Sequence, residues 1–498
     1  MELLAKKKQK RVEERLRTHE EMLLDAYFAE FEGKCLLPKP EKKKMREDIT
    51  RAISDLCEMG VPLTEALSRL SADNLGGFYS RSSAMWYSLD NAAKIYPISM
   101  KKGSMAVFRL SAYMKKDVVP SLLQMALSFT VRRFPSFATT LKKGFFWHYL
   151  NTSKTRYAVL EEKSVPCSPI SVSRSNSHTF RVLYYKNRIS VEFFHVLTDG
   201  MGGMEFLKTL ISEYLRLLGK DINLRGRGYS LKEAPSKEEF ENGFEIVPNA
   251  KKASGFVDKR SVQMSGKMAS ARPARVIHLK MDTEKLLEVS RKYSATVTAY
   301  LLSVMFLAFK MSCEEMTGEA SIQLPVNMRK YVPTRTLRNF SMYCGIRLPI
   351  ESITTKEDMI PLIKKQMEEK TSFQEMQKMT TATKRLVGPL RLVPLFVKQP
   401  LVRLVYAFLG DRLFSTTFSN LGVQSLPPEM AEEIESLDFV LGPSDINGAM
   451  CTLITLGNKS TFTVTKSTVD PSFENEIFRI LKEDGIDAAA EGSEIYGN

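Results

Sequence analysis

Apolar residues recur along the chain with the two spacings that predict helices and strands. Segments 118–134 and 206–218 each carry an apolar stripe of helical period, which predicts two amphipathic helices. Between them, 182–185 and 189–194 are rich in β-branched and aromatic residues, and the polar residues that separate the two runs predict a hairpin. The first half of the chain is therefore predicted to alternate strands with helices.

The second half repeats this alternation after a stretch that is poor in apolar residues. Strands are predicted at 275–281, 321–326, 343–349, 415–419, 450–456 and 460–465, and helices at 282–310 and 472–484. The pattern indicates an α/β protein with two domains. We expect four parts: a helical, charged extension over 1–80, an N-terminal domain over 81–220, a crossover linker over 221–274 and a C-terminal domain over 275–498.

Composition and charge agree with a globular protein and favour an anionic partner. Apolar residues make up 43% of the 498 residues and charged residues 26%, which excludes a disordered or fibrous chain. The net charge of +15 suits nucleic acid, a membrane surface or a phosphorylated small molecule such as coenzyme A. We find no nucleic-acid-binding motif and predict no nucleic-acid partner.

Cysteine and histidine spacing predicts neither a disulfide framework nor a metal site. The six cysteines include no CxxC pair, and none of the five histidines lies four residues from another. We expect no signal peptide, and the longest clean apolar run, Ala299–Phe309, is shorter than the ~20 residues that cross a bilayer. The chain is predicted to be cytoplasmic, with a peripheral membrane location as the alternative.

The segment with most chemical content runs from Phe193 to Gly203, at the end of a β-rich run and before an amphipathic helix. His195 would stand at a strand end, where a cleft can form, and an imidazole can accept a proton near neutral pH. Asp199 follows four residues later and could accept backbone N–H bonds or pair with an arginine. The glycines at 200, 202 and 203 are expected to allow a tight turn.

This segment has two other interpretations. His195 could be a satisfied core histidine, but the His-x-x-x-Asp-Gly spacing, the glycines and the strand–loop–helix context favour a functional one. The glycines also suggest a dinucleotide-binding turn, but their spacing is wrong and no apolar strand ends at Asp221.

On these residues the chain resembles the chloramphenicol-acetyltransferase-like superfamily, whose motif is HHxxxDG, and within it the alcohol acetyltransferase branch. The first histidine of the motif is Phe194 here, and the DFGWG motif of the plant enzymes is absent. Weaker supporting stretches lie at 86–97, 133–137, 324–329 and 418–422, so the resemblance covers about 84–480.

The resemblance implies two similar domains, each a mixed β-sheet flanked by helices, with an active-site tunnel at their interface. It implies an acyl-CoA-dependent O-acyltransferase in which His195 is the general base for direct transfer to an alcohol or amine. Asp199, with Gly200 in the same motif, would hold the loop, and Arg329 is the candidate partner of Asp199. Ser419 and Asn420 are candidate oxyanion donors, although Asn420 with Gly422 could simply form a turn.

By this resemblance no cofactor or metal is bound, and acyl-CoA is a co-substrate. A carrier-protein thioester is the alternative donor, and basic residues of the crossover are candidate phosphate contacts: Lys251, Lys252, Lys259, Arg260, Lys267, Arg272 and Arg275. The alternatives for function are a wax ester or lipid O-acyltransferase, a peptide-synthetase-type condensation enzyme, and a non-catalytic scaffold of the same fold.

A second segment, 384–412, combines six basic residues with one acidic residue among many apolar ones. Prolines at 389, 394 and 400 are expected to break it into short helices. It is predicted either to contact an anionic membrane or to form a core-facing helix pair whose basic side chains reach solvent.

Overall fold

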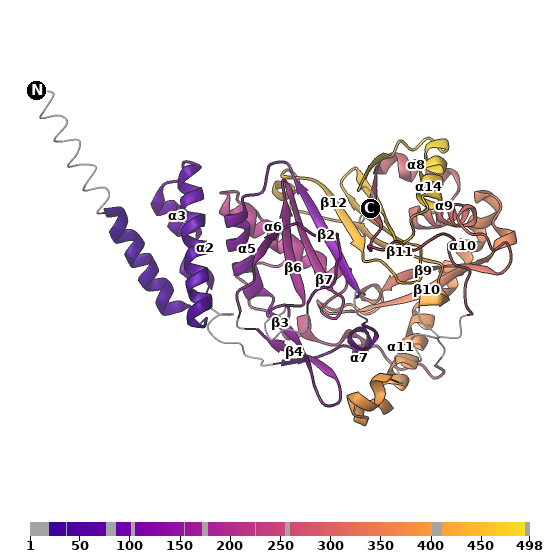
Figure 1. Ribbon diagram of the computed structural model, residues 1–498, viewed down its shortest axis with the longest axis horizontal. Helices are drawn as coiled ribbons and strands as arrows, with labels where there is room; N and C mark the ends of the chain where they lie inside the picture. Colours follow the sequence, from indigo (N-terminus) through magenta and orange to yellow (C-terminus); the bar gives the residue numbers. More distant parts are fainter. Residues whose placement is uncertain are drawn as a thin grey trace, which may run out of the picture.

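The computed structural model describes residues 19–493 apart from 36, 76–85, 101–104, 154, 172–177, 225, 254–258 and 401–410. These residues form an elongated molecule in which two larger sheets carry helices on their faces (Figure 1). The strands are β1 (Trp86–Ser88), β2 (Val107–Met114), β3 (Thr139–Lys143), β4 (His148–Thr152), β5 (Val159–Glu161), β6 (Phe180–Tyr185), β7 (Arg188–Phe194), β8 (Arg275–Asp282), β9 (Glu319–Asn327), β10 (Ser341–Pro349), β11 (Thr416–Val423), β12 (Ile434–Leu441), β13 (Ala449–Leu456), β14 (Lys459–Lys466) and β15 (Ala489–Gly492).

The first described α-helix covers residues 19–34. It is followed by α2 (Lys39–Glu58), α3 (Leu63–Arg69), α4 (Tyr96–Ser99), α5 (Pro120–Arg133), α6 (Gly200–Leu217), α7 (Gly243–Ile246), α8 (Thr283–Lys292), α9 (Val297–Met311), α10 (Lys356–Lys370), α11 (Phe373–Val387), α13 (Pro428–Ala431) and α14 (Ser472–Glu483). Short 3-10 turns join them: η1 (Ala72–Leu75), η2 (Lys237–Phe240), η3 (Met328–Lys330), η4 (Ile350–Ser352), η5 (Pro389–Leu392) and η6 (Asp411–Leu413).

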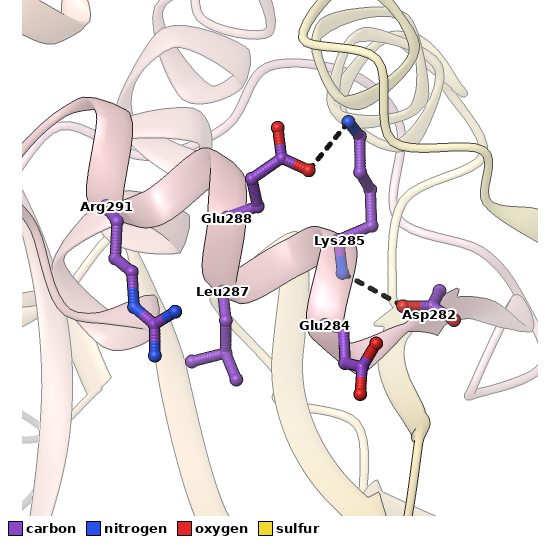
Figure 2. A pocket seen from close by; sticks show the side chains of 6 residues that line it. All are labelled: Asp282, Glu284, Lys285, Leu287, Glu288 and Arg291. Atoms are coloured by element: carbon purple, nitrogen blue, oxygen red, sulfur yellow. Dashed lines mark hydrogen bonds and ion pairs between the residues drawn. The ribbon is translucent and has the colours of Figure 1, made fainter.

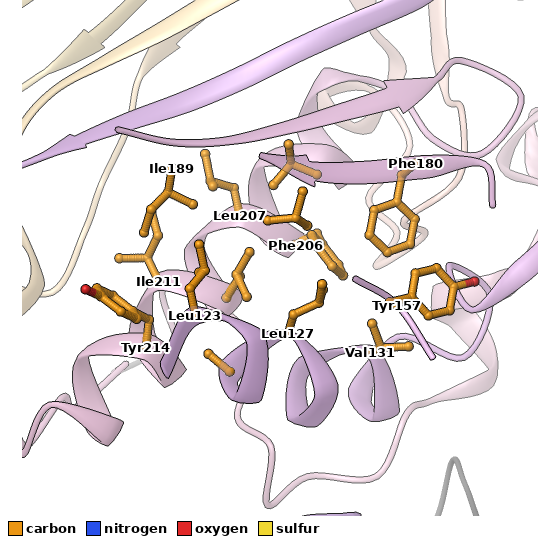
Figure 3. Close-up of a cluster of buried hydrophobic side chains, with 14 of the residues drawn as sticks. Leu123, Leu127, Val131, Tyr157, Phe180, Ile189, Phe206, Leu207, Ile211 and Tyr214 are labelled. Carbon is orange, nitrogen blue, oxygen red and sulfur yellow. The ribbon is translucent and has the colours of Figure 1, made fainter. Parts of the chain in front are cut away.

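The first large sheet has the order β12-β2-β7-β6-β5, with one parallel pair, β5 and β6. Helices α5 and α6 cover one face of it, and their apolar stripes meet the inward-facing strand residues (Figure 3). Leu127 of α5 and Phe206 of α6 lie in this cluster beside Phe180 of β6. Burying these stripes is what fixes both helices on the sheet and so sets the position where β7 leads into α6.

The second large sheet has the order β10-β9-β11-β13-β14-β8-β15 and is also mixed, because β11 pairs in parallel with both neighbours. Helix α9, which is apolar on all sides, packs against β9, α10 and α14 in the core of this half. Among the described helices none is by itself long and apolar enough to cross a membrane. Helices α8 and α9 reach that length only as a pair bent by 78°.

The two halves are joined at the first sheet. Strand β12, from the last third of the chain, pairs antiparallel with β2 and lies beside it in Figure 1 as a gold strand next to a purple one. The chain thus completes its first sheet with a strand from its C-terminal half. The assignment of 221–274 as the linker between two domains stays a prediction.

The N-terminal extension packs on the first half. Helix α2 lies beside α5, and the Arg156 guanidinium donates to Asp48 at 2.8 Å and to Gln124 at 3.2 Å. Burial raises the pKa of Asp48, although Arg156 opposes that shift. The contact ties the extension to the first half of the chain.

Most elements predicted from the hydrophobic pattern are present, including the β6–β7 hairpin and the α5, α6 and α14 helices. The pattern did not predict β12, α10 or α11. Segment 384–412 holds the end of α11, the η5 turn and a helix beginning at 395, and its residues 401–410 lie outside the described part. The prolines at 389 and 394 stand where helices break, as expected from the missing N–H, but Pro400 lies within the helix that begins at 395.

Candidate active site

His195 follows directly on β7, where the sheet ends. Its backbone N–H donates to the carbonyl of Ala106 at 2.8 Å, so the residue is held by the neighbouring strand. The imidazole is partly exposed and stacks on the ring of Tyr96, with 4.8 Å between the ring centroids. The Phe108 ring meets it edge-on at 5.2 Å. Two rings therefore restrict the imidazole to one orientation.

A chain of hydrogen bonds fixes which imidazole nitrogen carries the proton. Nδ2 of Asn339 donates to Oδ2 of Asp90 at 3.1 Å, so the amide oxygen of Asn339 faces His195. That oxygen lies 2.8 Å from Nδ1 of His195 and can only accept. Nδ1 therefore carries the hydrogen, and Nε2 carries the lone pair. Nε2 has no hydrogen-bond partner within the part of the chain that the structure describes.

Asp90 is fully buried and held from two further sides. Its Oδ1 accepts from the N–H of Ala93 at 2.7 Å, and the Arg338 guanidinium lies 3.7 Å from Oδ2. Burial raises the pKa of Asp90, whereas Arg338 acts to lower it. The carboxyl is thus placed to orient Asn339 from behind, on the side away from His195.

Asp199 holds the start of α6 against the second half of the chain. It caps the helix by accepting from the N–H of Gly202 at 3.1 Å, and it pairs with Arg329 at 2.8 Å. The N–H of Phe340 donates to the same carboxylate at 2.8 Å. Burial alone would raise the pKa of Asp199, but Arg329 and these N–H groups hold it below its usual value. The Asp199 carboxylate is therefore ionised, and its partners hold the loop between β7 and α6 in place.

Asp199 and Arg329 also hold the loop that carries Asn339. Arg329 also donates to the carbonyls of Thr336 and Arg338, at 2.9 and 2.7 Å. Because Phe340 follows Asn339, the Asp199–Arg329 pair fixes the segment that presents the Asn339 amide to His195. The two carboxylates, Asp90 and Asp199, therefore both act on the imidazole through residue 339.

The glycines of the motif have a different role from the one expected. None of Gly200, Gly202 and Gly203 has a positive φ, so they do not form a left-handed turn and instead begin α6. A Cβ at Gly202 would lie 2.2 Å from the carbonyl oxygen of Leu337. The absence of side chains lets α6 approach the loop that carries Asn339.

Gly200 lies close to the segment of β11 that holds the oxyanion candidates. A Cβ at Gly200 would lie 2.8 Å from Cδ2 of Leu421, the residue after Asn420. Asn420 donates to Thr298 at 3.1 Å and accepts from the N–H of Gly422 at 2.7 Å, and Gly422 has φ +69°. Its amide is thus engaged in a turn, the alternative considered from the sequence. Ser419 is half-buried, and its hydroxyl makes no hydrogen bond to any described residue.

Sequence reasoning did not single out Asn339, Asp90 or Tyr96 as site residues. Asp90 and Tyr96 lie in the stretch 86–97 that carried part of the resemblance. Asn339 lies in a segment with no recognisable spacing, and only its contact with His195 reveals it.

A depression of about 650 Å³ lies over α8, away from these residues (Figure 2). It is lined by Asp282, Glu284, Lys285, Leu287, Glu288 and Arg291. Lys285 pairs with Glu288 at 3.0 Å within it, and none of the candidate site residues lines it. Within the described residues no group of three or more His, Cys, Asp or Glu side chains is placed to hold a metal ion.

The crossover cations are partly engaged already. Arg272 pairs with Asp445 at 2.7 Å, and Arg275 lies 3.8 Å from Glu474. Lys251, Lys252 and Lys259 are exposed. Arg260 and Lys267 are exposed as well, so these five cations are the ones left to meet a phosphate.

No protein-family model matches the chain, and no curated protein matches it by sequence. Solved structures match it by fold. The trichothecene 15-O-acetyltransferase TRI3 of Fusarium sporotrichioides superposes with a TM-score of 0.53 at 12% identity, covering 81% of this chain and 96% of that one. TRI101 of the same species, solved with coenzyme A and T-2, gives 0.55 at 10% identity over 82% and 100%.

Two further matches extend the comparison. Polyketide synthase associated protein 5 of Mycobacterium tuberculosis gives a TM-score of 0.51 at 13% identity, over 79% of this chain and 96% of that one. The first condensation domain of the calcium-dependent antibiotic synthetase gives 0.53 at 11% identity, over 81% and 97%. The expected fold is confirmed: the chain has the chloramphenicol-acetyltransferase-like fold, with two mixed sheets flanked by helices.

Proposed function

We propose that this protein is an acyltransferase that moves an acyl group from acyl-CoA to an alcohol or amine acceptor, with His195 as the general base. The observation that carries the proposal is the orientation of one imidazole. Asn339 holds the hydrogen on Nδ1, which leaves Nε2 of a partly exposed ring with a lone pair. A base must present such a nitrogen to the proton it removes.

The comparisons support the choice of reaction. Two of the matching structures are described as an acetyltransferase and as a complex with coenzyme A and T-2. Their likeness to this chain is one of fold, so the donor and the acceptor class are part of the proposal. The positive net charge of +15 agrees with a donor that carries phosphates.

The transfer needs one base and no covalent enzyme intermediate. Nε2 of His195 takes the proton of the acceptor hydroxyl as its oxygen attacks the thioester carbonyl. The C–O bond forms, the C–S bond of the tetrahedral intermediate breaks, and the proton passes to the departing thiolate. Positioning both substrates lowers the barrier by several kcal/mol, and the base adds about 10²–10⁴-fold.

The other site residues have supporting roles in this proposal. Asn339 and Asp90 keep the imidazole in the reactive tautomer, and Asp199 with Arg329 holds the loop that carries Asn339. Because the Asn420 amide is engaged with Thr298 and Gly422, Ser419 is the better oxyanion candidate of the two.

The test is a screen of the full chain against acyl-CoA thioesters of varied length, each combined with a panel of alcohols and amines. Release of the free thiol and appearance of the acylated acceptor are measured together, with His195→Ala as the matched control. The proposal predicts that both products form with the wild type and are lost in the variant. Equal turnover by the two proteins would remove His195 from the chemistry.

The same screen, extended with carrier-protein thioesters as donors, separates the alternatives. A preference for long acyl chains and long-chain alcohols identifies a wax ester or lipid O-acyltransferase. Activity only with a carrier-protein thioester identifies a condensation enzyme. Silence of the wild type across all donors and acceptors contradicts the proposal and favours a scaffold of the same fold.

A further inference from the structure

Six large apolar side chains are exposed on two segments that are distant in sequence. One segment is the tip of the β3–β4 hairpin, and the other runs from the end of α11 through η5 to the helix that begins at 395. Leu392 is 79% exposed, and Phe145 and Phe396 are each 66% exposed. The full set, here called the hairpin–helix surface, is Phe145, Phe146, Leu386, Leu392, Phe396 and Val397.

The two segments are fastened to each other. The N–H of Leu395 donates to the carbonyl of Phe145 at 2.8 Å, and the Lys398 ammonium lies 3.2 Å from the centre of the Trp147 ring. Lys398 also donates to the carbonyl of Leu390 at 2.9 Å. In Figure 1 the β3–β4 loop and the end of α11 both project at the lower edge of the molecule. The exposed apolar side chains are therefore carried by two segments that are held side by side.

The same surface carries positive charge without compensating acids. Lys143, Arg385 and Arg391 are exposed and form no ion pair with any residue that the structure describes. Segments 139–152 and 384–400 contain no aspartate or glutamate. Elsewhere, exposed cations often have a carboxylate beside them, such as Lys285 with Glu288. Exposed aromatic and aliphatic side chains among unpaired cations are what an anionic lipid surface complements.

We infer that the hairpin–helix surface docks on a membrane that contains anionic lipid. The phenylalanine and leucine side chains enter the boundary between headgroups and acyl chains, and the lysine and arginines meet lipid phosphates or carboxylates. Large apolar side chains gathered on adjoining exposed segments mark interaction sites in soluble proteins. A purely apolar partner would not explain the unpaired cations around it.

The surface is connected to the candidate active site. The Lys94 ammonium lies 5.7 Å from the centre of the Trp147 ring, and Tyr96, two residues later, stacks on His195. The residues that link this surface to His195 are therefore few: Trp147, Lys94 and Tyr96. If the proposed function holds, the acyl donor or the acceptor is apolar and reaches the site from the lipid; the docking itself does not depend on that function.

The test is flotation of the full chain with vesicles of phosphatidylcholine in which phosphatidylserine makes up about a third of the lipid. We expect binding at about 0.05 M salt, much weaker binding at about 0.5 M, and little binding to pure phosphatidylcholine. Failure of the wild type to float with the anionic vesicles at low salt overturns the inference, whatever the enzyme assay shows.

Two double variants locate the contact. Phe145→Ser/Phe146→Ser and Arg385→Gln/Arg391→Gln should each weaken binding by about 30-fold, because each removes two groups that contact lipid. Their controls alter other exposed residues elsewhere: Met311→Ser/Met316→Ser for the apolar pair and Arg291→Gln/Lys482→Gln for the cations. All four variants change exposed side chains, and unchanged melting temperatures would show that they fold.

Other results contradict the docking. Equal losses in the surface variants and their controls would show nonspecific attraction to charged lipid. A wild type that self-associates without lipid, and becomes monomeric on Phe145→Ser/Phe146→Ser, would show that a second copy of the chain covers this surface.

Discussion

Asn339 Oδ1 lies 2.8 Å from Nδ1 of His195, and this contact joins residues that are 144 positions apart. The histidine follows a strand of the first sheet, while the asparagine belongs to the loop before β10 of the second. The reactive orientation of the imidazole is therefore a property of how the two halves of the chain meet. A change in either half that moves this loop would change the orientation of the imidazole and so the position of Nε2.

The substitution Asn339→Leu tests that dependence. The leucine side chain has a similar volume but cannot accept a hydrogen bond from Nδ1, so the imidazole would lose its fixed tautomer. We expect kcat to fall by about 10–100-fold with KM nearly unchanged, and the pH–rate profile to shift. Steady-state kinetics across pH on an active donor–acceptor pair would measure this. A variant with wild-type kcat and profile would show that Asn339 does not position His195.

Replacing Arg329 with methionine tests the anchor of the loop. Asp199 would remain buried and charged without its partner, which costs about 3–5 kcal/mol in the free energy of unfolding. Urea denaturation measures the loss, and Lys330→Met, at an exposed neighbouring cation, is the matched control. Adding Asp199→Asn to Arg329→Met should recover part of the loss. Equal stability of the two single variants would contradict a structural role for the pair.

The two glycines at the start of α6 should differ in their tolerance of alanine. At Gly202 a Cβ would meet the backbone oxygen of Leu337 at 2.2 Å, and backbone cannot move aside cheaply. At Gly200 it would meet a terminal methyl of Leu421 at 2.8 Å, which can rotate away. We expect Gly202→Ala to cost about 3 kcal/mol and Gly200→Ala about 1 kcal/mol or less in unfolding free energy. The reverse order would mean that the helix start can shift.

His178 should make the stability of the protein depend on pH. Burial lowers its pKa from 6.5 to about 4, and its ring stacks on Tyr157 while Nε2 bonds Thr155 at 2.7 Å. As pH falls below 6.5 the unfolded chain binds a proton that the folded chain refuses, so stability is lost. Between pH 7 and pH 5 the wild type should lose about 2 kcal/mol more than His178→Gln, as measured by urea denaturation at each pH. Parallel stability curves would contradict this assignment.

The sequence predicted most of the fold because the elements that build it carry clear periodicity. The stripes of α5 and α6 and the β6–β7 hairpin were all visible as patterns of apolar residues. Strand β12 was not predicted, because its pairing with β2 joins positions more than 300 residues apart and leaves no local signal. Helix α10 buries only Met359, Ile360 and Ile363. Helix α11 buries Met376 and three threonines, so neither helix has an apolar stripe that stands out in the sequence.

The candidate site was predictable only in part. His195 and Asp199 lie in one short motif, so their spacing in the sequence was enough to identify both. Arg329 was named through the resemblance, and Asn339 could not be named at all, because its role arises from a contact between distant loops. The requirement for glycine at 202 also depends on a backbone from the other half of the chain.

The role of His195 is tested most directly by the single-turnover rate of acyl transfer in the wild type and in His195→Ala. Each protein would be in molar excess over the acyl-CoA, with the acceptor that the screen identifies, so that product release does not mask the chemical step. We predict a rate at least about 10²-fold lower in the variant, since the acceptor proton would have no base to receive it. Equal single-turnover rates would contradict the assignment of His195 as the general base.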